Sequence, residues 1–167
     1  MPSTYTPIAT TTVSGTSTFS VTFSSISSSY TDLILVVANA SFSSAAQSAL
    51  RFNGDTGNNY SWTVMSGDGG STASLRGSNV GIIQLGYFDY LDAGKNYTAV
   101  CQINGYSGTN NNKTTIVRGN EASLGVGAGV GLWRNTAAIT SVTFLPAYGG
   151  AYIGAGSTFT LYGVKSA

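Results

Sequence analysis

The sequence has no histidine, a single cysteine and few charged side chains. Charged residues make up 8% of the 167 residues and hydrophobic ones 42%, whereas an average soluble domain carries about a quarter charged residues. The lack of histidine excludes Ser-His-Asp catalysis and histidine-ligated metal sites. The one cysteine, Cys101, excludes an intrachain disulfide framework and is expected to be a small buried residue within a strand. This composition is typical of a packing and recognition module.

The charge balance also limits the partners. The formal net charge is +1, and the 7 Lys and Arg residues form no basic run, so no nucleic-acid partner is expected. The longest aliphatic run, residues 33–38, is far shorter than the ~20 residues that span a bilayer, so no membrane partner is expected either. The opening Met-Pro-Ser-Thr-Tyr-Thr-Pro lacks the features of a secretory signal, which predicts synthesis in a cytosol.

Alternation of apolar and polar residues predicts an all-β protein. Phe19, Val21 and Phe23 share one face of a strand, with polar residues between them, and turn-forming residues separate about eight to ten such segments. We therefore expect residues 1–167 to form a single two-sheet antiparallel β-sandwich domain, a jelly roll. The expected core is Phe19, Val21, Phe23, Leu33, Leu35, Val37, Ile103, Val142, Phe144, Phe159 and Leu161.

Individual segments are assigned on the same grounds. Strands are predicted at residues 32–40, 49–52, 60–65, 80–85, 97–106, 113–120, 139–145 and 157–164. The continuous apolar run 32–40 predicts a strand covered on both faces. Residues 71–80 are predicted to be a polar loop and residues 43–50 a short helical turn. The glycine-rich residues 125–131 are predicted to be a bend where another chain's backbone or a neighbouring sheet comes close. Residues 1–8, with Pro2 and Pro7, are predicted to be an extended arm lying on a neighbouring subunit.

Two groups of residues have side chains that could form a catalytic carboxylate pair or a metal site. Asp89 and Asp92 are the only close pair of acids, and paired carboxylates are what a glycosidase requires. We favour a solvated loop there and expect no enzymatic activity and no catalytic residue. Asn53, Asp55, Asn58 and Asn59, with Asp68 from outside, offer oxygen ligands for Ca²⁺. Because this loop has only one carboxylate, we favour a loop of Asx turns and expect no metal or other cofactor; a weak Ca²⁺ site is left open.

Aromatic side chains are the strongest candidates for a binding surface. Tyrosine and tryptophan provide much of the contact area in protein interfaces and sugar-binding surfaces. The residues expected at an interface are Tyr5, Pro7, Trp62, Tyr87, Phe88, Tyr90 and Trp133.

Several sequence blocks together resemble small virion proteins of tailed marine bacteriophages, cyanophages among them. They are the opening residues 1–12, residues 23–36, Arg51-Phe52-Asn53-Gly54-Asp55, residues 131–141 and the ending 156–165. The resemblance implies a jelly-roll structural protein of the virion, either a capsid decoration (cement) protein or a fibre-tip module. It transfers no catalytic residue.

The resemblance leads to one expected function and two rivals. The expected function is a non-enzymatic decoration protein that stabilises the assembled head, located in the virion after synthesis in a bacterial cytoplasm. Its partners would be the major capsid protein or other virion proteins and further copies of itself. We prefer it because the sandwich begins almost at the first residue, without a fibre shaft. The first rival is a receptor-binding tail or head fibre module that recognises host surface glycans; the second is a glycan-degrading enzyme that uses Asp89 and Asp92.

Overall fold

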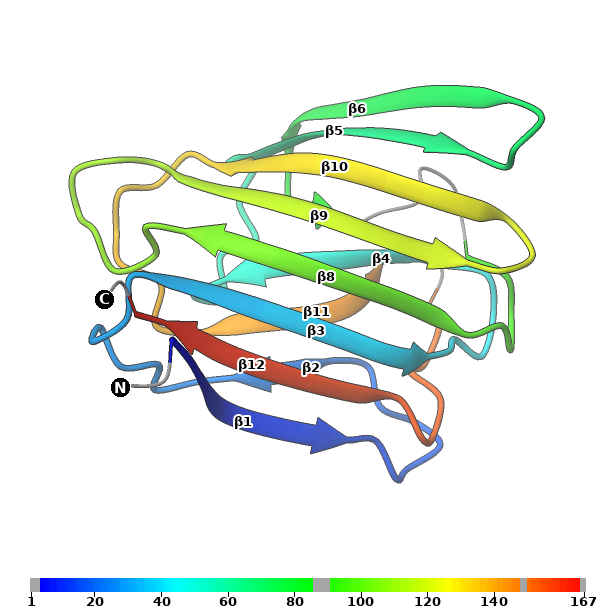
Figure 1. Cartoon of the computed structure of the whole chain (residues 1–167), viewed down its shortest axis with the longest axis horizontal. Helices are drawn as coiled ribbons and strands as arrows, with labels where there is room; N and C mark the ends of the chain where they lie inside the picture. The colour runs from blue at the N-terminus through cyan, green and yellow to red at the C-terminus, as the bar shows by residue number, and fades with distance from the viewer. Residues whose placement is uncertain (1–3, 86–90, 148–149, 166–167) are drawn as a thin grey trace.

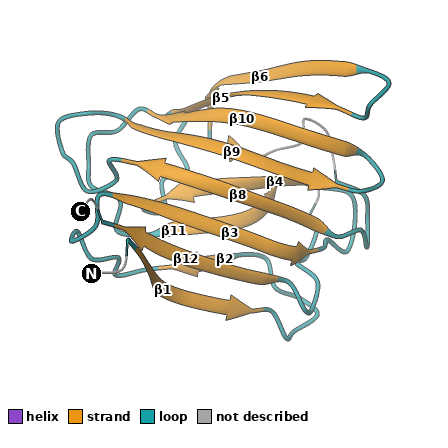
Figure 2. Ribbon diagram, viewed as in Figure 1, coloured by secondary structure: helices purple, strands orange, loops and turns teal. Residues whose placement is uncertain are grey.

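The computed structural model describes residues 4–85, 91–147 and 150–165. Within these residues the protein consists of β-strands, turns and loops (Figure 2). The strands are β1 (Tyr5–Thr12), β2 (Val21–Phe23), β3 (Asp32–Ala40), β4 (Gln47–Phe52), β5 (Tyr60–Gly67), β6 (Thr72–Val80), β7 (Ile83–Gln84), β8 (Tyr97–Asn104), β9 (Lys113–Glu121), β10 (Gly125–Trp133), β11 (Val142–Ala147) and β12 (Thr158–Val164). In the part of the chain that is described, no helix is long and apolar enough to cross a membrane.

The strands form two antiparallel sheets. The larger has eight strands in the order β1-β12-β3-β8-β9-β10-β5-β6, and the smaller has four in the order β2-β11-β4-β7. The small sheet lies behind the part of the large sheet that carries β12, β3 and β8 (Figure 1). The predicted all-β sandwich is confirmed.

The order of the strands identifies the sandwich as a jelly roll. When the β5–β6 and β9–β10 hairpins are set aside, the remaining strands lie in the orders β1-β12-β3-β8 and β2-β11-β4-β7. Along the chain, every consecutive pair of these eight strands except β4 and β7 places one strand in each sheet, which is the double Greek-key wrapping of a jelly roll. The two hairpins add β9, β10, β5 and β6 to the large sheet alone.

The core lies between the two sheets and contains every residue of the expected set but one, together with further residues such as Phe52, Tyr60 and Tyr106. The predicted residues Val21, Phe23, Leu33, Leu35, Val37, Ile103, Val142, Phe144, Phe159 and Leu161 are all buried. Phe19 is 60% exposed, so its prediction as core is wrong. The chain forms a bridge between Thr18 and Ile153 and begins β2 only at Val21. The alternation of β2 therefore does not extend back to Phe19, whose ring packs on Tyr152 with ring centroids 4.5 Å apart.

Three segment predictions are wrong and a fourth is right only in part, because context outweighs local composition. Residues 71–80 form the edge strand β6, whose side chains are mostly exposed, so the sequence shows no apolar alternation. Residues 125–131 lie in β10, which pairs with β9 and β5 on its two sides. Residues 43–50 contain no helical turn, since Ala46 bridges to Leu91 and β4 begins at Gln47. The run 32–40 does form β3, but it is buried on one face and only partly covered on the other.

The N-terminal prediction also needs correction. Residues 5–8 belong to β1, which pairs with β12 of the same chain from Tyr5 opposite Val164 to Thr12 opposite Thr158. The ladder shifts between Pro7 and Ala9, as expected where proline has no N–H to donate. Residues 5–8 are extended, but they form an edge strand of their own domain, and residues 1–3 of the predicted arm lie outside the described residues.

Candidate functional site

Strand β10 has an unusual alternation, because glycine occupies its inward positions and apolar side chains its outward ones. Gly127, Gly129 and Gly131 are buried, whereas Val126, Ala128 and Val130 are exposed. A Cβ on Gly131 would lie 2.4 Å from Cγ2 of Ile83 in β7. On Gly129 it would lie 2.9 Å from Cγ2 of Val64. Neighbouring side chains therefore fill the interior at β10, and its own apolar side chains face outward.

These outward residues belong to a larger apolar strip, which we define as Met65, Ile116, Val126, Ala128 and Val130. Within it, Met65 is 65%, Val126 63%, Val130 55% and Ile116 54% exposed. Val130 lies opposite Ile116 of β9, and Ala128 lies opposite Met65 of β5. Residues directly opposite on one face of a sheet have Cβ atoms about 5 Å apart. The five side chains therefore form one surface across three adjacent strands.

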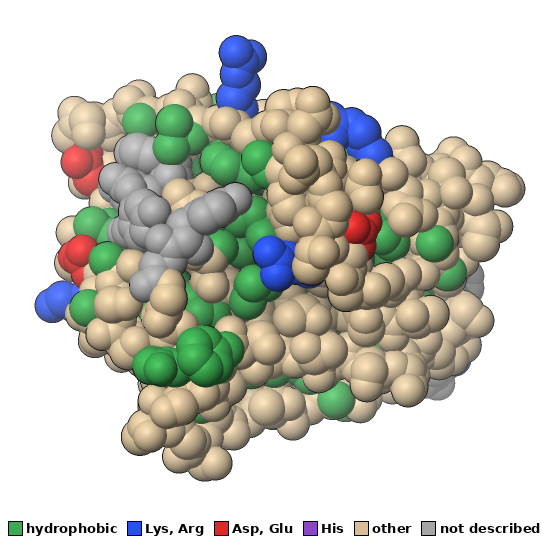
Figure 3. All heavy atoms as spheres, turned by 180° about the vertical axis from the view of Figure 1, so that it is seen from behind, with side chains coloured by type: hydrophobic (Ala, Val, Ile, Leu, Met, Phe, Trp, Pro, Cys, Tyr) green, Lys and Arg blue, Asp and Glu red, His purple; other side chains and the backbone are tan. Residues whose placement is uncertain are grey.

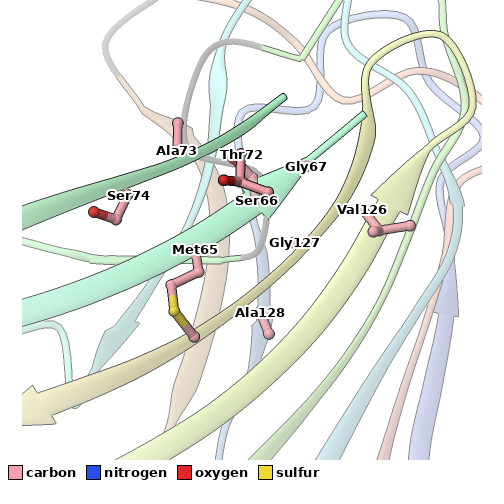
Figure 4. Close-up of a pocket in the computed structure, with 9 residues that line it drawn as sticks. All are labelled: Met65, Ser66, Gly67, Thr72, Ala73, Ser74, Val126, Gly127 and Ala128. Carbon is pink, nitrogen blue, oxygen red and sulfur yellow. The ribbon is translucent and has the colours of Figure 1, made fainter. Parts of the chain in front are cut away.

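The strip lies in shallow hollows on the outer face of the large sheet. One, of about 790 Å³, is bordered by Met65, Val126 and Ala128 of the strip together with residues of β6 (Figure 4). A second, of about 860 Å³, surrounds Ile116 and Val130. A third, of about 350 Å³, adjoins Val126. The apolar strip thus lines all three hollows, which we call together the depression.

The groups around the strip are polar but mostly uncharged. Thr63, Thr114, Ser78 and Asn104 line the second hollow together with Arg76, and Arg118 lines the third. No Asp or Glu is among the described residues that line the three hollows. A guanidinium stays protonated at physiological pH, so these hollows offer apolar contact and hydrogen bonds rather than proton transfer.

The interface residues expected from the sequence do not come together. Tyr5 and Pro7 are exposed on β1, at the opposite edge of the large sheet from β5 and β6. Trp62 is half-buried, and its indole lies so close over Gly77 of β6 that a Cβ there would be 2.6 Å from Nε1. Tyr87, Phe88 and Tyr90 lie outside the described residues.

Trp133 is a core residue, so its prediction as an interface residue is wrong. It is 1% exposed and packs edge-on against Phe52, with ring centroids 5.7 Å apart, and stacks on Tyr60 at 6.2 Å. Its indole Nε1–H donates to Oδ2 of Asp55 at 2.7 Å. Burial follows from its place at the inward end of the β10 alternation, where a side chain replaces glycine.

Asp55 is held by nitrogen donors rather than placed for a cation. Its Oδ1 accepts from the Gly57 N–H at 2.8 Å, and its Oδ2 accepts from Asn59 Nδ2 at 2.9 Å and from Trp133. Burial alone would raise the pKa of this carboxyl, but these three donors outweigh it and lower the pKa below its usual value. The bond from the Gly57 N–H to Asp55 closes an Asx turn, the local structure that the sequence favours for this loop.

The remaining oxygen ligands considered for Ca²⁺ lie elsewhere. Asn53 Oδ1 accepts from the N–H groups of Thr140 and Ser141, at 2.8 and 3.1 Å. Asp68 follows the last residue of β5, whereas Asp55 precedes the first, and a strand of this length spans about 25 Å. The two carboxylates therefore cannot share an ion. Within the described ranges, no three His, Cys, Asp or Glu side chains gather as metal ligands do.

Neither Asp92 nor Cys101 is part of the depression. Asp92 is exposed in the loop before β8, and Asp89 lies outside the described residues, so the acid pair is not tested. Glu121 is fully buried and accepts from the Asp92 N–H at 2.9 Å, and it also accepts from the Ser123 hydroxyl. Cys101 is fully buried, as expected, and burial raises the pKa of its thiol to about 12. A thiol in this state is a packing group and not a nucleophile.

Sequence reasoning missed the apolar strip entirely. The signal was present in Gly125-Val-Gly-Ala-Gly-Val-Gly131, which alternates with the period of a strand. Because glycine is unfavourable in strands, the sequence of residues 125–131 favours a bend over a strand. Only the pairing of β10 with both neighbours reveals which residues of this alternation face outward.

Comparison with known proteins adds little at this point. No family model matches the chain, and no curated protein matches it. Among solved structures, the alginate lyase Aly36B is 10% identical with a TM-score of 0.32, over 82% of this chain and 70% of that one. A protein of unknown function from Shewanella oneidensis MR-1 is 9% identical with a TM-score of 0.24, over 98% of this chain and 77% of that one. Similarity at this level supports no statement about activity or substrate.

Proposed function

We propose that this chain is a non-enzymatic structural protein of a bacteriophage virion, which decorates the assembled head and stabilises it. The outer face of the large sheet is the binding surface in this proposal. The observation that carries it is the apolar strip, where four large aliphatic or thioether side chains are each more than half exposed on adjacent strands. A large cluster of exposed apolar side chains that is rimmed by polar ones usually marks a site of interaction with another molecule.

The strength of such a contact follows from area. Covering the strip removes apolar surface from water, at about 25 cal/mol per Å². The rim of hydroxyl and amide groups can pair with main-chain groups of the partner. Because the chain carries a net charge of only +1, closely packed copies repel one another little, and attachment should depend only weakly on salt.

Two further properties support the phage head, rather than a soluble protein, as the binding partner. The sequence blocks described above resemble phage virion proteins, and a decoration protein binds a regular shell at many equivalent places. Binding only the assembled shell stabilises that shell by mass action. The face seen from behind in Figure 3 is consistent with dense packing, since only a few of its side chains are charged.

The test compares phage particles with and without this protein. Particles that lack it should assemble and adsorb to cells normally, but they should release DNA at a lower temperature. Purified protein added back should restore the release temperature. Unchanged heat release together with lost adsorption would refute decoration and favour a receptor-binding module.

The receptor-binding alternative has one structural observation in its favour. The second hollow combines an apolar floor with hydroxyl and amide groups and Arg76, a set that can bind a polar chain such as a host surface glycan. The same particles distinguish the two functions. If the protein is a glycan-binding module, particles that lack it should lose adsorption to cells but keep their thermal stability.

A further inference from the structure

The four edge strands of the two sheets are not equally protected against pairing with another strand. The outer strands are β1 and β6 in the large sheet and β2 and β7 in the small one. β2 has three residues and β7 two, too few for a stable new ladder. β1 has Pro7 and a register shift beside it. Short strands, proline and bulges are the devices by which proteins prevent edge-to-edge association.

β6 has only one of these protections, a bulge at its end, where Asn79 has a φ of 55°. It has nine residues, no proline and a single charged side chain, Arg76. Its ladder with β5 runs without a shift from Gly67 opposite Thr72 to Ser61 opposite Ser78, and the only irregularity follows at the Tyr60 end. In an antiparallel ladder every second residue directs its N–H and C=O away from the partner strand. β6 therefore presents a straight row of main-chain donors and acceptors.

The side chains of β6 suit one particular partner, which is a second β6. Leu75 is 44% exposed and lies opposite Val64, on the face that the small sheet does not cover at this edge. With Leu75 of two copies opposite each other, Ala73 would lie opposite Gly77, which leaves room on the same face. On the other face, Arg76 would lie opposite Ser74, so that the two arginines are not paired.

We propose that two copies of this chain associate through antiparallel pairing of their β6 strands, with Leu75 of both copies at the two-fold axis. Pairing joins the two large sheets into one continuous sheet and covers both Leu75 side chains. A two-fold contact is self-complementary, since the same edge supplies donors to and accepts from its copy. The pairing does not depend on what the apolar strip binds.

Cysteine cross-linking tests the register. Directly opposite residues of an antiparallel pair have Cα atoms about 4.5–5.5 Å apart, which is within the range for a disulfide. Leu75→Cys should therefore form a covalent dimer on mild oxidation. Ser78→Cys is the matched control on the same strand, because its own copy would lie about 20 Å away in this register. The buried Cys101 does not compete.

We expect Leu75→Cys to cross-link about tenfold faster than Ser78→Cys or more. Unmodified protein should change from monomer to dimer in light scattering as its concentration rises. Leu75→Lys, which places like charges at the axis, should weaken that dimer about tenfold or more. Equal cross-linking of the two cysteine variants, a chain that stays monomeric at millimolar concentration, or a dimer unaffected by Leu75→Lys would each overturn the proposal.

Discussion

Trp133 and Asp55, which are far apart in the sequence, are joined by a 2.7 Å hydrogen bond from the indole Nε1 to the Asp55 Oδ2. The bond connects the buried end of β10 to the loop between β4 and β5. Tyr60 reaches the same loop, since its hydroxyl donates to the Asp55 carbonyl at 3.1 Å. Asp55 is therefore a structural anchor of the sandwich.

Removal of this anchor should destabilise the fold. Asp55→Ala leaves the buried indole N–H without an acceptor, which costs about 1–3 kcal/mol of unfolding free energy. Urea denaturation measures the loss. Asn58→Ala, at an exposed position in the same loop, is the control and should change stability little. An equal loss in both variants would show that the indole bond is not what anchors the loop.

The Asp55 carboxyl should also add to the acid sensitivity of the protein. Its pKa is lowered in the folded state from the usual 3.8, so its contribution is fully present above that value and is lost as the pH falls through the folded pKa. Urea midpoints measured from neutral pH down to about pH 2 should fall less steeply in Asp55→Asn than in the unmodified protein. Identical pH dependence would mean that Asp55 does not carry a lowered pKa.

The β-sandwich and part of its core could be predicted from alternation, because residues such as Leu33 and Phe159 bury one face of a strand. The apolar strip and β6 could not. Val126 and Val130 face outward because glycine faces inward, which depends on how close Ile83 and Val64 approach from other strands. The aromatic character of Trp133 predicts a surface position. In the structure it lies two residues after Gly131, on the inward-facing side of β10. These outcomes depend on long-range pairing that a local pattern does not contain.

The close approach of the sheets at β10 predicts that Gly131 does not tolerate a side chain. In Gly131→Ala the new Cβ would lie 2.4 Å from Ile83 Cγ2 and 2.6 Å from Thr115 Oγ1. We expect a loss of about 1–3 kcal/mol in unfolding free energy from overpacking, measured by thermal and urea denaturation. Gly15→Ala is the control, since the nearest atom to its Cβ would be 3.8 Å away, and its stability should be unchanged or slightly higher. A fully stable Gly131→Ala would show that the sheets can separate at this point.

Cys101 should be inert in the folded protein. It is completely buried and the pKa of its thiol is raised to about 12, so almost no thiolate forms at neutral or mildly alkaline pH. A thiol reagent such as iodoacetamide should modify it only after denaturation, as mass spectrometry would show. Rapid modification of the native protein would mean that β3 or β9 separates from β8 often enough to expose it.

The most direct test of the binding account measures attachment of the chain to phage heads that lack it, with the apolar strip altered. Val130→Ser and Met65→Ser both alter exposed side chains, so the unfolding free energy should be nearly unchanged. Each should weaken the free energy of binding to heads, measured by co-sedimentation, by about 1–3 kcal/mol if the residue is central to the contact. Thr143→Ser, on the outer face of the small sheet, is the control and should bind as the unmodified chain does. Weakened binding by the strip variants alone is the predicted result, and heads that bind all of these proteins equally would contradict the account.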